Sequence, residues 1–287
     1  MDALAVIFAV LGAASNAAGT AFQRKAAAPM KSGGGLRFLL ALVRQPAWLI
    51  GILGVICAFL FQALALYNGP IALVQPLFVL ELPFALMIAG PLLHRRMPRV
   101  GWYGVGGVVI GLATLLAAAS PRGNQDQASM TQWIPALIGC YGLIVVAVAI
   151  ARTSHSSLVR AALLGSAAAV GNAMTAVLIK SATGTLGTQG VGAFLTTWQT
   201  YGFAITGIAA VLLLENALQA GSLAASQPAL TIGDAAVSLL LGITVFGETI
   251  RTGWWLVPEL IGVILVCLGV VVLARAIGRV QETHPVQ

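Results

Sequence analysis

Two carboxylates lie in the middle of long apolar segments of this chain. Glu81 falls within the apolar window 71–93 and Asp234 within the window 222–246. A charged group at the centre of a bilayer costs about 2.5 to 3.5 kcal/mol, so it needs a cation, a proton or water beside it. The two acids therefore predict a site that handles charge. If the cargo is a divalent cation, Glu81 and Asp234 are its expected metal ligands.

A glutamine and a proline precede each of these acids. Gln75 and Pro76 stand before the first, and Gln227 and Pro228 before the second. Proline has no amide N–H, so it frees a helix carbonyl and kinks or opens the helix. A free carbonyl, an amide and a carboxylate within two helical turns form an oxygen-rich site that suits a cation. Helix packing is the alternative role for both residue types.

Four further polar side chains are candidates for lining a path through the protein. Asn16 and Asn172 lie inside the first and sixth apolar windows, and we expect them on opposite sides of the membrane midplane. Gln199 and Tyr201 belong to a polar and aromatic cluster in the seventh window, where a ring face could contact an organic cation. Bonding between neighbouring helices is the alternative for the asparagines, and interfacial anchoring for the tyrosine.

The segments 69–85 and 221–237 repeat one pattern at an offset of 152 residues. Gln75-Pro76 matches Gln227-Pro228, and Arg99-x-Gly101-Trp102 matches Arg251-x-Gly253-Trp254. This register predicts a first repeat over 1–120, a linker with a fifth helix over 121–157, and a second repeat over 158–287. Glu81 itself aligns with Gly233, one residue before Asp234, so the spacing leaves open whether the two acids face each other.

Composition places the chain in a membrane. Apolar residues make up 59% of it and charged residues only 8%, with a mean hydropathy of +0.96. A span needs about 20 apolar residues. Nine windows meet this requirement: 3–22, 47–67, 71–93, 101–119, 133–151, 159–179, 191–214, 222–246 and 254–274. The predicted fold is an all-α polytopic membrane protein of about nine transmembrane helices, in two inverted four-helix repeats joined by a linker helix.

The basic residues predict an orientation. With the N-terminus outside and the C-terminus in the cytoplasm, 12 of the 15 basic residues fall in cytoplasmic loops, as the positive-inside rule requires. Arg122, Lys180 and Arg251 are then the exterior ones. The net charge of +7 follows from this topology, so we expect no nucleic-acid partner. Abundant alanine, glycine, valine and leucine favour a bacterial plasma (inner) membrane.

Catalytic patterns are not found in the sequence. It contains no nucleophile elbow, no zinc-protease motif and no phosphate-binding loop. We therefore expect a protein that is not an enzyme and needs no cofactor. Its expected partners are the lipid bilayer and a small-molecule or ion substrate, and the sequence leaves a homodimer open.

The order of motifs resembles a known superfamily of carriers. The run Tyr67-x-x-Pro70-x-Ala72-Leu73-Val74-x-Pro76-Leu77 is followed by a basic loop and by a glycine-rich helix over 101–119. This order is similar to that of the drug/metabolite transporter (DMT) superfamily, in its EamA-like members and the NIPA-type magnesium transporter branch. The resemblance implies an inverted-repeat helical carrier that works by alternating access without an ATP-binding module.

These observations predict a secondary transporter of a small cationic or amphiphilic solute, coupled to an ion or a proton. Glu81 and Asp234 are its expected charge-handling pair, and the two helices that carry them its expected moving parts. Three alternatives remain: a magnesium or divalent-cation transporter of NIPA type, a carrier of neutral metabolites whose acids handle only protons, and a membrane scaffold or accessory subunit that transports nothing.

Overall fold

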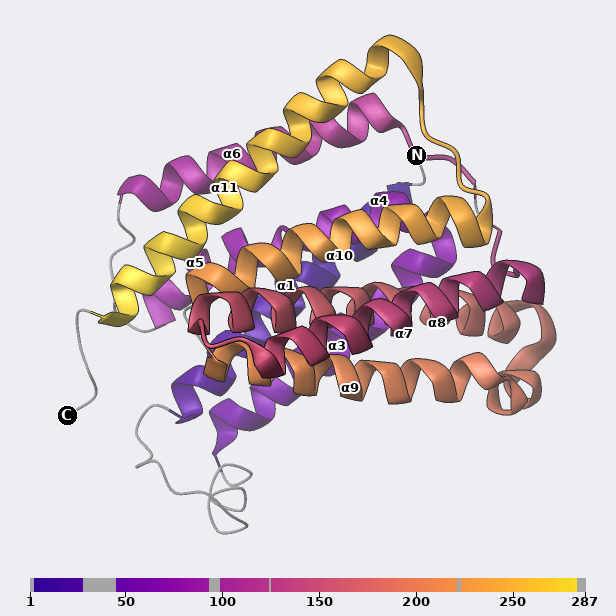
Figure 1. Cartoon of the computed structure of the whole chain (residues 1–287), viewed down its shortest axis with the longest axis horizontal. Coiled ribbons are helices and arrows are strands. Elements are labelled where there is room, and N and C mark those ends of the chain that lie inside the picture. The colour runs from indigo at the N-terminus through magenta and orange to yellow at the C-terminus, as the bar shows by residue number, and fades with distance from the viewer. Residues whose placement is uncertain (1–2, 28–44, 93–98, 124, 221–222, 283–287) are drawn as a thin grey trace.

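The computed structural model describes residues 3–27, 45–92, 99–123, 125–220 and 223–282. Within these ranges the chain is almost entirely helical and has no strand (Figure 1). Its elements are α1 (Ala3–Ala27), α3 (Pro46–Asn68), α4 (Ile71–Phe78), α5 (Glu81–Leu92), α6 (Arg99–Ala119), α7 (Met130–Thr153), α8 (Ser157–Thr196), α9 (Trp198–Ala220), α10 (Leu223–Phe246), the 3-10 turn η1 (Gly253–Trp255) and α11 (Leu256–Glu282).

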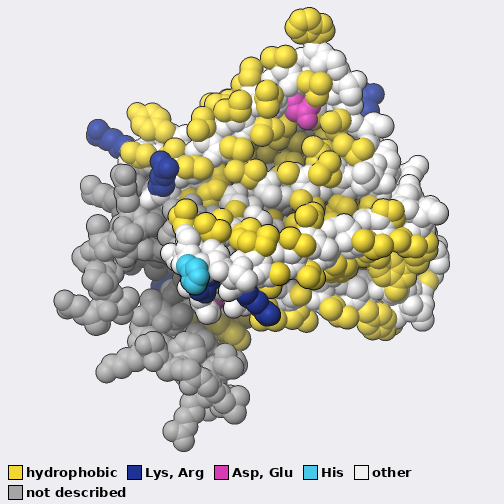
Figure 2. Space-filling view, in the orientation of Figure 1, with side chains coloured by type: hydrophobic (Ala, Val, Ile, Leu, Met, Phe, Trp, Pro, Cys, Tyr) yellow, Lys and Arg dark blue, Asp and Glu magenta, His cyan; other side chains and the backbone are white. Residues whose placement is uncertain are grey.

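Nine stretches of the described helices are long and apolar enough to cross a membrane. This confirms the predicted all-α polytopic class. Large apolar side chains cover the outside of the molecule, as Figure 2 shows, and Tyr103, Ile138 and Ile205 are among the most exposed. Only lipid can cover that much apolar surface without penalty, because water would have to order around it.

Most helices run between two ends of the molecule. Gly69, which follows α3, and Glu248, which follows α10, lie at one end beside Lys180, and we call this the Lys180 end. α7 finishes with Arg152 at the opposite end, the Arg152 end. α1 begins at the Lys180 end, since Ala5 packs on Gly69. The described chain therefore starts at one end and finishes at the other, as an odd number of spans requires (Figure 1).

Helices expected to be equivalent pack in corresponding pairs: α1 along α3, and α8 along α9. α6 packs along α11 (Figure 1). The loop after α6 and the loop before α11 meet in a short bridge, where Arg122 and Thr249 exchange two backbone hydrogen bonds of 2.9 Å. α6 and α11 are therefore antiparallel. The repeat boundaries themselves and the orientation in the membrane stay predictions.

The third apolar window was expected to form one helix, but it forms two. α4 ends at Phe78 and α5 begins at Glu81. Between them Val79 and Leu80 make tight turns, in which each amide bonds the carbonyl three residues earlier. Pro83 accounts for the break, because it has no N–H to bond the Val79 carbonyl and its ring would clash with that carbonyl in a continuous helix. In the first turn of α5 the same proline is tolerated.

The sixth helix is much longer than the expected window 159–179. α8 continues through Lys180 to a kink at Gly190, where φ is 81° and favours glycine. No proline interrupts this stretch, and the residues just past 179 are buried by neighbouring loops rather than exposed at a surface. Lys180 was predicted to lie outside the membrane on the exterior. Its side chain is fully buried within the protein, and the side of the membrane to which this end belongs stays a prediction.

Glycines bring α6 and α11 into backbone contact. A Cβ atom added at Gly262 would lie 2.6 Å from the Leu115 amide nitrogen and 2.8 Å from the Gly111 carbonyl oxygen. One added at Gly269 would lie 2.7 Å from the Val108 amide nitrogen. Small residues at such a crossing let two membrane helices approach closely enough for extensive van der Waals contact.

We expect Gly262→Ala to destabilise the protein by about 1 to 3 kcal/mol, because α6 and α11 must separate to admit the methyl group. Thermal unfolding of the purified protein in detergent measures the effect. Gly142→Ala on α7 is the matched control, since a Cβ there meets no atom within 4 Å. Alanine has a higher helix propensity than glycine, so this control substitution should leave stability unchanged or raise it by up to about 1 kcal/mol. Equal effects of the two substitutions would contradict close packing at this crossing.

Candidate functional site

The two carboxylates lie at similar depth below the Lys180 end. Glu81 is ten residues beyond Ile71, the first residue of α4, and Asp234 is twelve residues before Phe246, the last of α10. A helical rise of about 1.5 Å per residue places both about 15 to 18 Å from that end. This is half of a hydrocarbon core about 30 Å thick. Both acids therefore lie near the middle of the bundle.

The tertiary structure places these two side chains within range of each other's charge. Glu81 and Asp234 are close enough for their charges to interact, and each is half-buried. Asp234 also accepts a hydrogen bond of 3.2 Å from the hydroxyl of Ser238, one turn further along α10. Glu81 stands at the start of α5, where the helix dipole favours a negative charge. One proton or one cation between the two groups would relieve their repulsion.

The two asparagines lie on the helices that flank this pair. Gly12 of α1 packs against the ring of Phe78, the last residue of α4. Asn16 is one turn further along α1 and so is level with the start of α5. On the other side, Ala169 of α8 packs against Gly233, and Asn172 follows it by three residues. Both asparagines are half-buried. That the two asparagines line a path past the acids stays a prediction.

The remaining candidates lie further away or outside the described side chains. Gln75 is buried in α4. Gln199 is buried in the first turn of α9, where its carbonyl oxygen accepts a hydrogen bond from Thr197, and thus belongs to the Lys180 end. Tyr201 is 59% exposed, and its hydroxyl donates to the Leu195 carbonyl at 2.8 Å. The side chain of Gln227 lies outside the described part.

Neither expected proline kink coincides with the observed break. The helix is interrupted at residues 79–80, after Pro76 and before Pro83, so Pro76 remains inside α4. Pro228 lies inside α10, which is one helix from Leu223 to Phe246. A bend at Pro228 stays a prediction. The interruption beside Glu81 is therefore explained by Pro83, and an oxygen-rich site there stays a prediction.

A second cluster of charges closes the Lys180 end. The ammonium of Lys180 lies 2.9 Å from a carboxylate oxygen of Glu248, and both side chains are fully buried. Lys180 also donates to the Gly69 carbonyl at 3.1 Å. The Glu248 carboxylate accepts hydrogen bonds from the amides of Ile71 at 2.7 Å and Ala72 at 2.9 Å. These contacts fasten α8, the end of α3, the start of α4 and the end of α10 together.

Aromatic rings cover this ion pair. Lys180 lies 5.2 Å from the ring centre of Phe246. Trp133 meets Phe246 edge to face at 6.3 Å and Trp198 at 5.0 Å. The rings keep water away from the charges, and in such surroundings a charge without a partner is costly. Removing one of the two charges would therefore leave the other buried without its counter-charge.

Asp126 adds a third titratable group at this end, in the loop between α6 and α7. Its side chain packs on Gly184 of α8, and its Oδ1 atom is buried with no hydrogen-bond partner among the described residues. Burial raises the pKa of the Asp126 carboxyl, and the nearby positive charge of Lys180 opposes that rise without cancelling it. The neighbouring Gln127 donates to the Ser181 carbonyl and to the Thr185 hydroxyl.

We expect Asp126→Asn to change the pH dependence of stability. The raised pKa means that the folded state holds its proton more tightly than the unfolded chain, so the parent loses stability as pH rises from about 4 through the folded-state pKa. The variant should match the parent at pH 4 and exceed it at pH 7. Melting temperatures at several pH values measure this, with Glu215→Gln at the exposed end of α9 as the control. A variant less stable than the parent at pH 7 would show that attraction to Lys180 prevails over burial.

Sequence reasoning missed Glu248 and the burial of Lys180. Each follows a long apolar window and so resembles a charge at the membrane surface. The signal available was Phe246-Gly247-Glu248, in which a turn glycine with φ of 62° lets the chain fold back on the helix that precedes it. The Glu248 amide accordingly donates to the Gly242 carbonyl at 3.0 Å. No pattern in the sequence identifies Lys180 as the ion-pair partner of Glu248.

The comparisons with known proteins add one similarity. The chain is 27% identical over 285 residues to an uncharacterized protein of Corynebacterium glutamicum, and the match covers 96% of this chain and 95% of that protein. No protein-family profile matches the chain, and no solved structure matches it. The similarity extends over both halves of the chain and the linker. It does not indicate an activity, because the relative is uncharacterized. What is established is a multi-pass helical membrane protein with two charge clusters, the half-buried acids Glu81 and Asp234 and the fully buried pair Lys180 and Glu248.

Proposed function

We propose that this protein is a secondary transporter of a small cationic or amphiphilic solute, coupled to a proton or another ion. The observation that carries the proposal is that Glu81 and Asp234 lie at mid-depth within range of each other's charge, beside an interrupted helix. Charges in the middle of a membrane are costly, and interrupted helices there are typical of carrier binding sites. An inverted-repeat carrier of this kind is also what the resemblance to the DMT superfamily implies.

The two charge clusters have complementary roles in this proposal. Glu81 and Asp234 hold the solute or the coupling proton halfway across. The Lys180–Glu248 cluster closes one end, because Glu248 ties the start of α4 to α10. Turning α4 about the break at residues 79–80 would detach it from Glu248 and open a path from that end to Glu81. In alternating access the opposite end then closes.

Divalent-cation transport is the second candidate, and the paired carboxylates favour it specifically. Magnesium keeps several of its waters and is commonly bound through one or two carboxylates. Glu81 and Asp234 would supply those, and the half-buried amides of Asn16 and Asn172 would contact the hydrated ion. No group of three or more acidic, histidine or cysteine side chains suited to a metal occurs among the described residues.

Flux into proteoliposomes tests the proposal. The purified parent and the double variant Glu81→Gln/Asp234→Asn are reconstituted, and uptake of protons, magnesium and a set of organic cations and neutral metabolites is followed with and without a membrane potential. We expect the parent, and not the double variant, to move one of these. Equal flux through both would refute the assignment of the acids, and no flux through either would favour the scaffold.

A further inference from the structure

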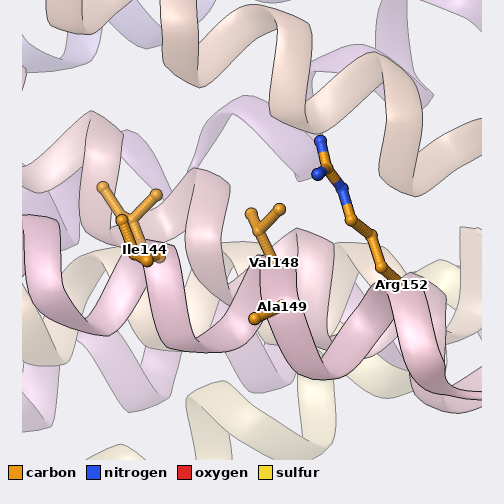
Figure 3. A pocket seen from close by; sticks show the side chains of 5 residues that line it. Ile144, Val148, Ala149 and Arg152 are labelled. Carbon is orange, nitrogen blue, oxygen red and sulfur yellow. The ribbon is translucent and has the colours of Figure 1, made fainter.

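A shallow groove runs along α7 and ends at an arginine. It has a cavity volume of about 340 Å³ and is lined by Ile144, Val145, Val148, Ala149 and Arg152. In Figure 3 the side chains of Ile144 and Val148 point to the same side of α7 as that of Arg152. Except for the arginine, the lining is apolar. From Ile144 to Arg152 the groove is about 12 Å long at the helical rise per residue.

The position of α7 in the membrane indicates which kind of molecule can occupy the groove. α7 is a membrane-spanning helix at the periphery of the molecule, with most of its surface exposed. Its groove therefore opens onto lipid chains. Arg152 lies in the last turn of the same helix and is exposed. A guanidinium at the end of a span is at the level of lipid headgroups, where its fork of N–H donors matches a phosphate.

Within the described part of the chain, no carboxylate forms an ion pair with this arginine. The ion pair found among the described residues joins Lys180 to Glu248 and does not involve Arg152. The sequence holds no acidic residue between Asp126 and Glu215. The turn that follows α7 adds the exposed side chain of His155, and the first turn of α8 adds that of Arg160. In Figure 2 the Lys, Arg and His side chains visible on this face gather mainly at one end of the molecule.

We propose that this groove binds one anionic phospholipid, with the lipid phosphate on Arg152 and an acyl chain along Ile144 and Val148. The apolar lining takes a chain of any lipid. The positive charge selects a headgroup that carries a net negative charge over a zwitterionic one. The site is separate from the two charge clusters and does not depend on the proposed transport.

Native mass spectrometry of the full chain in detergent tests this, by titration with dioleoyl phosphatidylglycerol and, in parallel, dioleoyl phosphatidylethanolamine. Both lipids have the same chains, so a difference in affinity reports the headgroup. One basic side chain near a membrane surface should favour the anionic lipid about fivefold. We expect Arg152→Ala to bring the ratio of the two affinities close to one.

Two further variants complete the test. Val148→Trp should weaken binding of both lipids, because the indole fills the groove, while the preference for the anionic lipid remains. Arg275→Ala removes an exposed basic residue near the end of α11 and should change nothing. The proposal fails if the parent has no preference, if Arg152→Ala keeps it, or if Arg275→Ala abolishes it equally, since the last result means diffuse attraction to the basic end.

Discussion

Replacing Lys180 with methionine is expected to lower the free energy of unfolding by about 3 to 5 kcal/mol, the cost of leaving a buried carboxylate without its counter-charge. Methionine retains most of the volume and apolar stem of lysine, so the loss reports mainly the charge. Glu248 would keep the amides of Ile71 and Ala72 as donors, but two N–H dipoles do not replace a cation in surroundings closed by aromatic rings. Unfolding of the purified protein in mixed micelles measures the loss.

A second substitution separates the charge from the packing. In Lys180→Met/Glu248→Gln neither charge remains, and the amide oxygen of glutamine can still accept a hydrogen bond from the start of α4. We expect the double variant to recover most of the lost stability, because a neutral pair of similar volume can replace a buried ion pair at little cost. Arg160→Met, at an exposed position, should change stability by less than about 0.5 kcal/mol. If the single and double variants are equally unstable, packing rather than charge holds this end.

Flux should fall by about tenfold or more when either midplane acid alone is neutralised, as Glu81→Gln or Asp234→Asn. Each substitution keeps the shape of the side chain and removes one negative charge, and a tenfold loss corresponds to about 1.4 kcal/mol of interaction. Because the two groups act on the same bound charge, the flux of the double variant should be only slightly lower than that of the slower single variant. Initial rates in proteoliposomes at matched protein density give all three values.

The control for this series removes a carboxylate elsewhere. Glu215→Gln lies at an exposed position near the end of α9 and should transport like the parent. Losses that multiply in the double variant would mean that Glu81 and Asp234 act at separate steps rather than as one pair. Undiminished flux in both single variants would make the acids structural, and the transport path would have to be sought away from the break in the third span.

By itself the sequence determined the class of the molecule and most of its helices. Long apolar windows can only be satisfied in a bilayer, and in a bilayer the backbone must bond to itself within helices. Local composition is therefore enough to find spans, and the nine predicted windows match nine described ones. The depth of Glu81 and Asp234 followed from the same reasoning, since depth is fixed by the distance of a residue from the ends of its own helix.

Tertiary structure alone decided which side chains meet. Glu81 and Asp234 aligned one residue out of register, a difference of about 100° around a helix, and only the tertiary structure places them within range of each other's charge. Lys180 and Glu248 are 68 residues apart and each looks like a surface charge in its own segment. Their pairing depends on how far α8 continues and where the chain turns after α10, because contacts between distant segments arise from packing that no local pattern encodes.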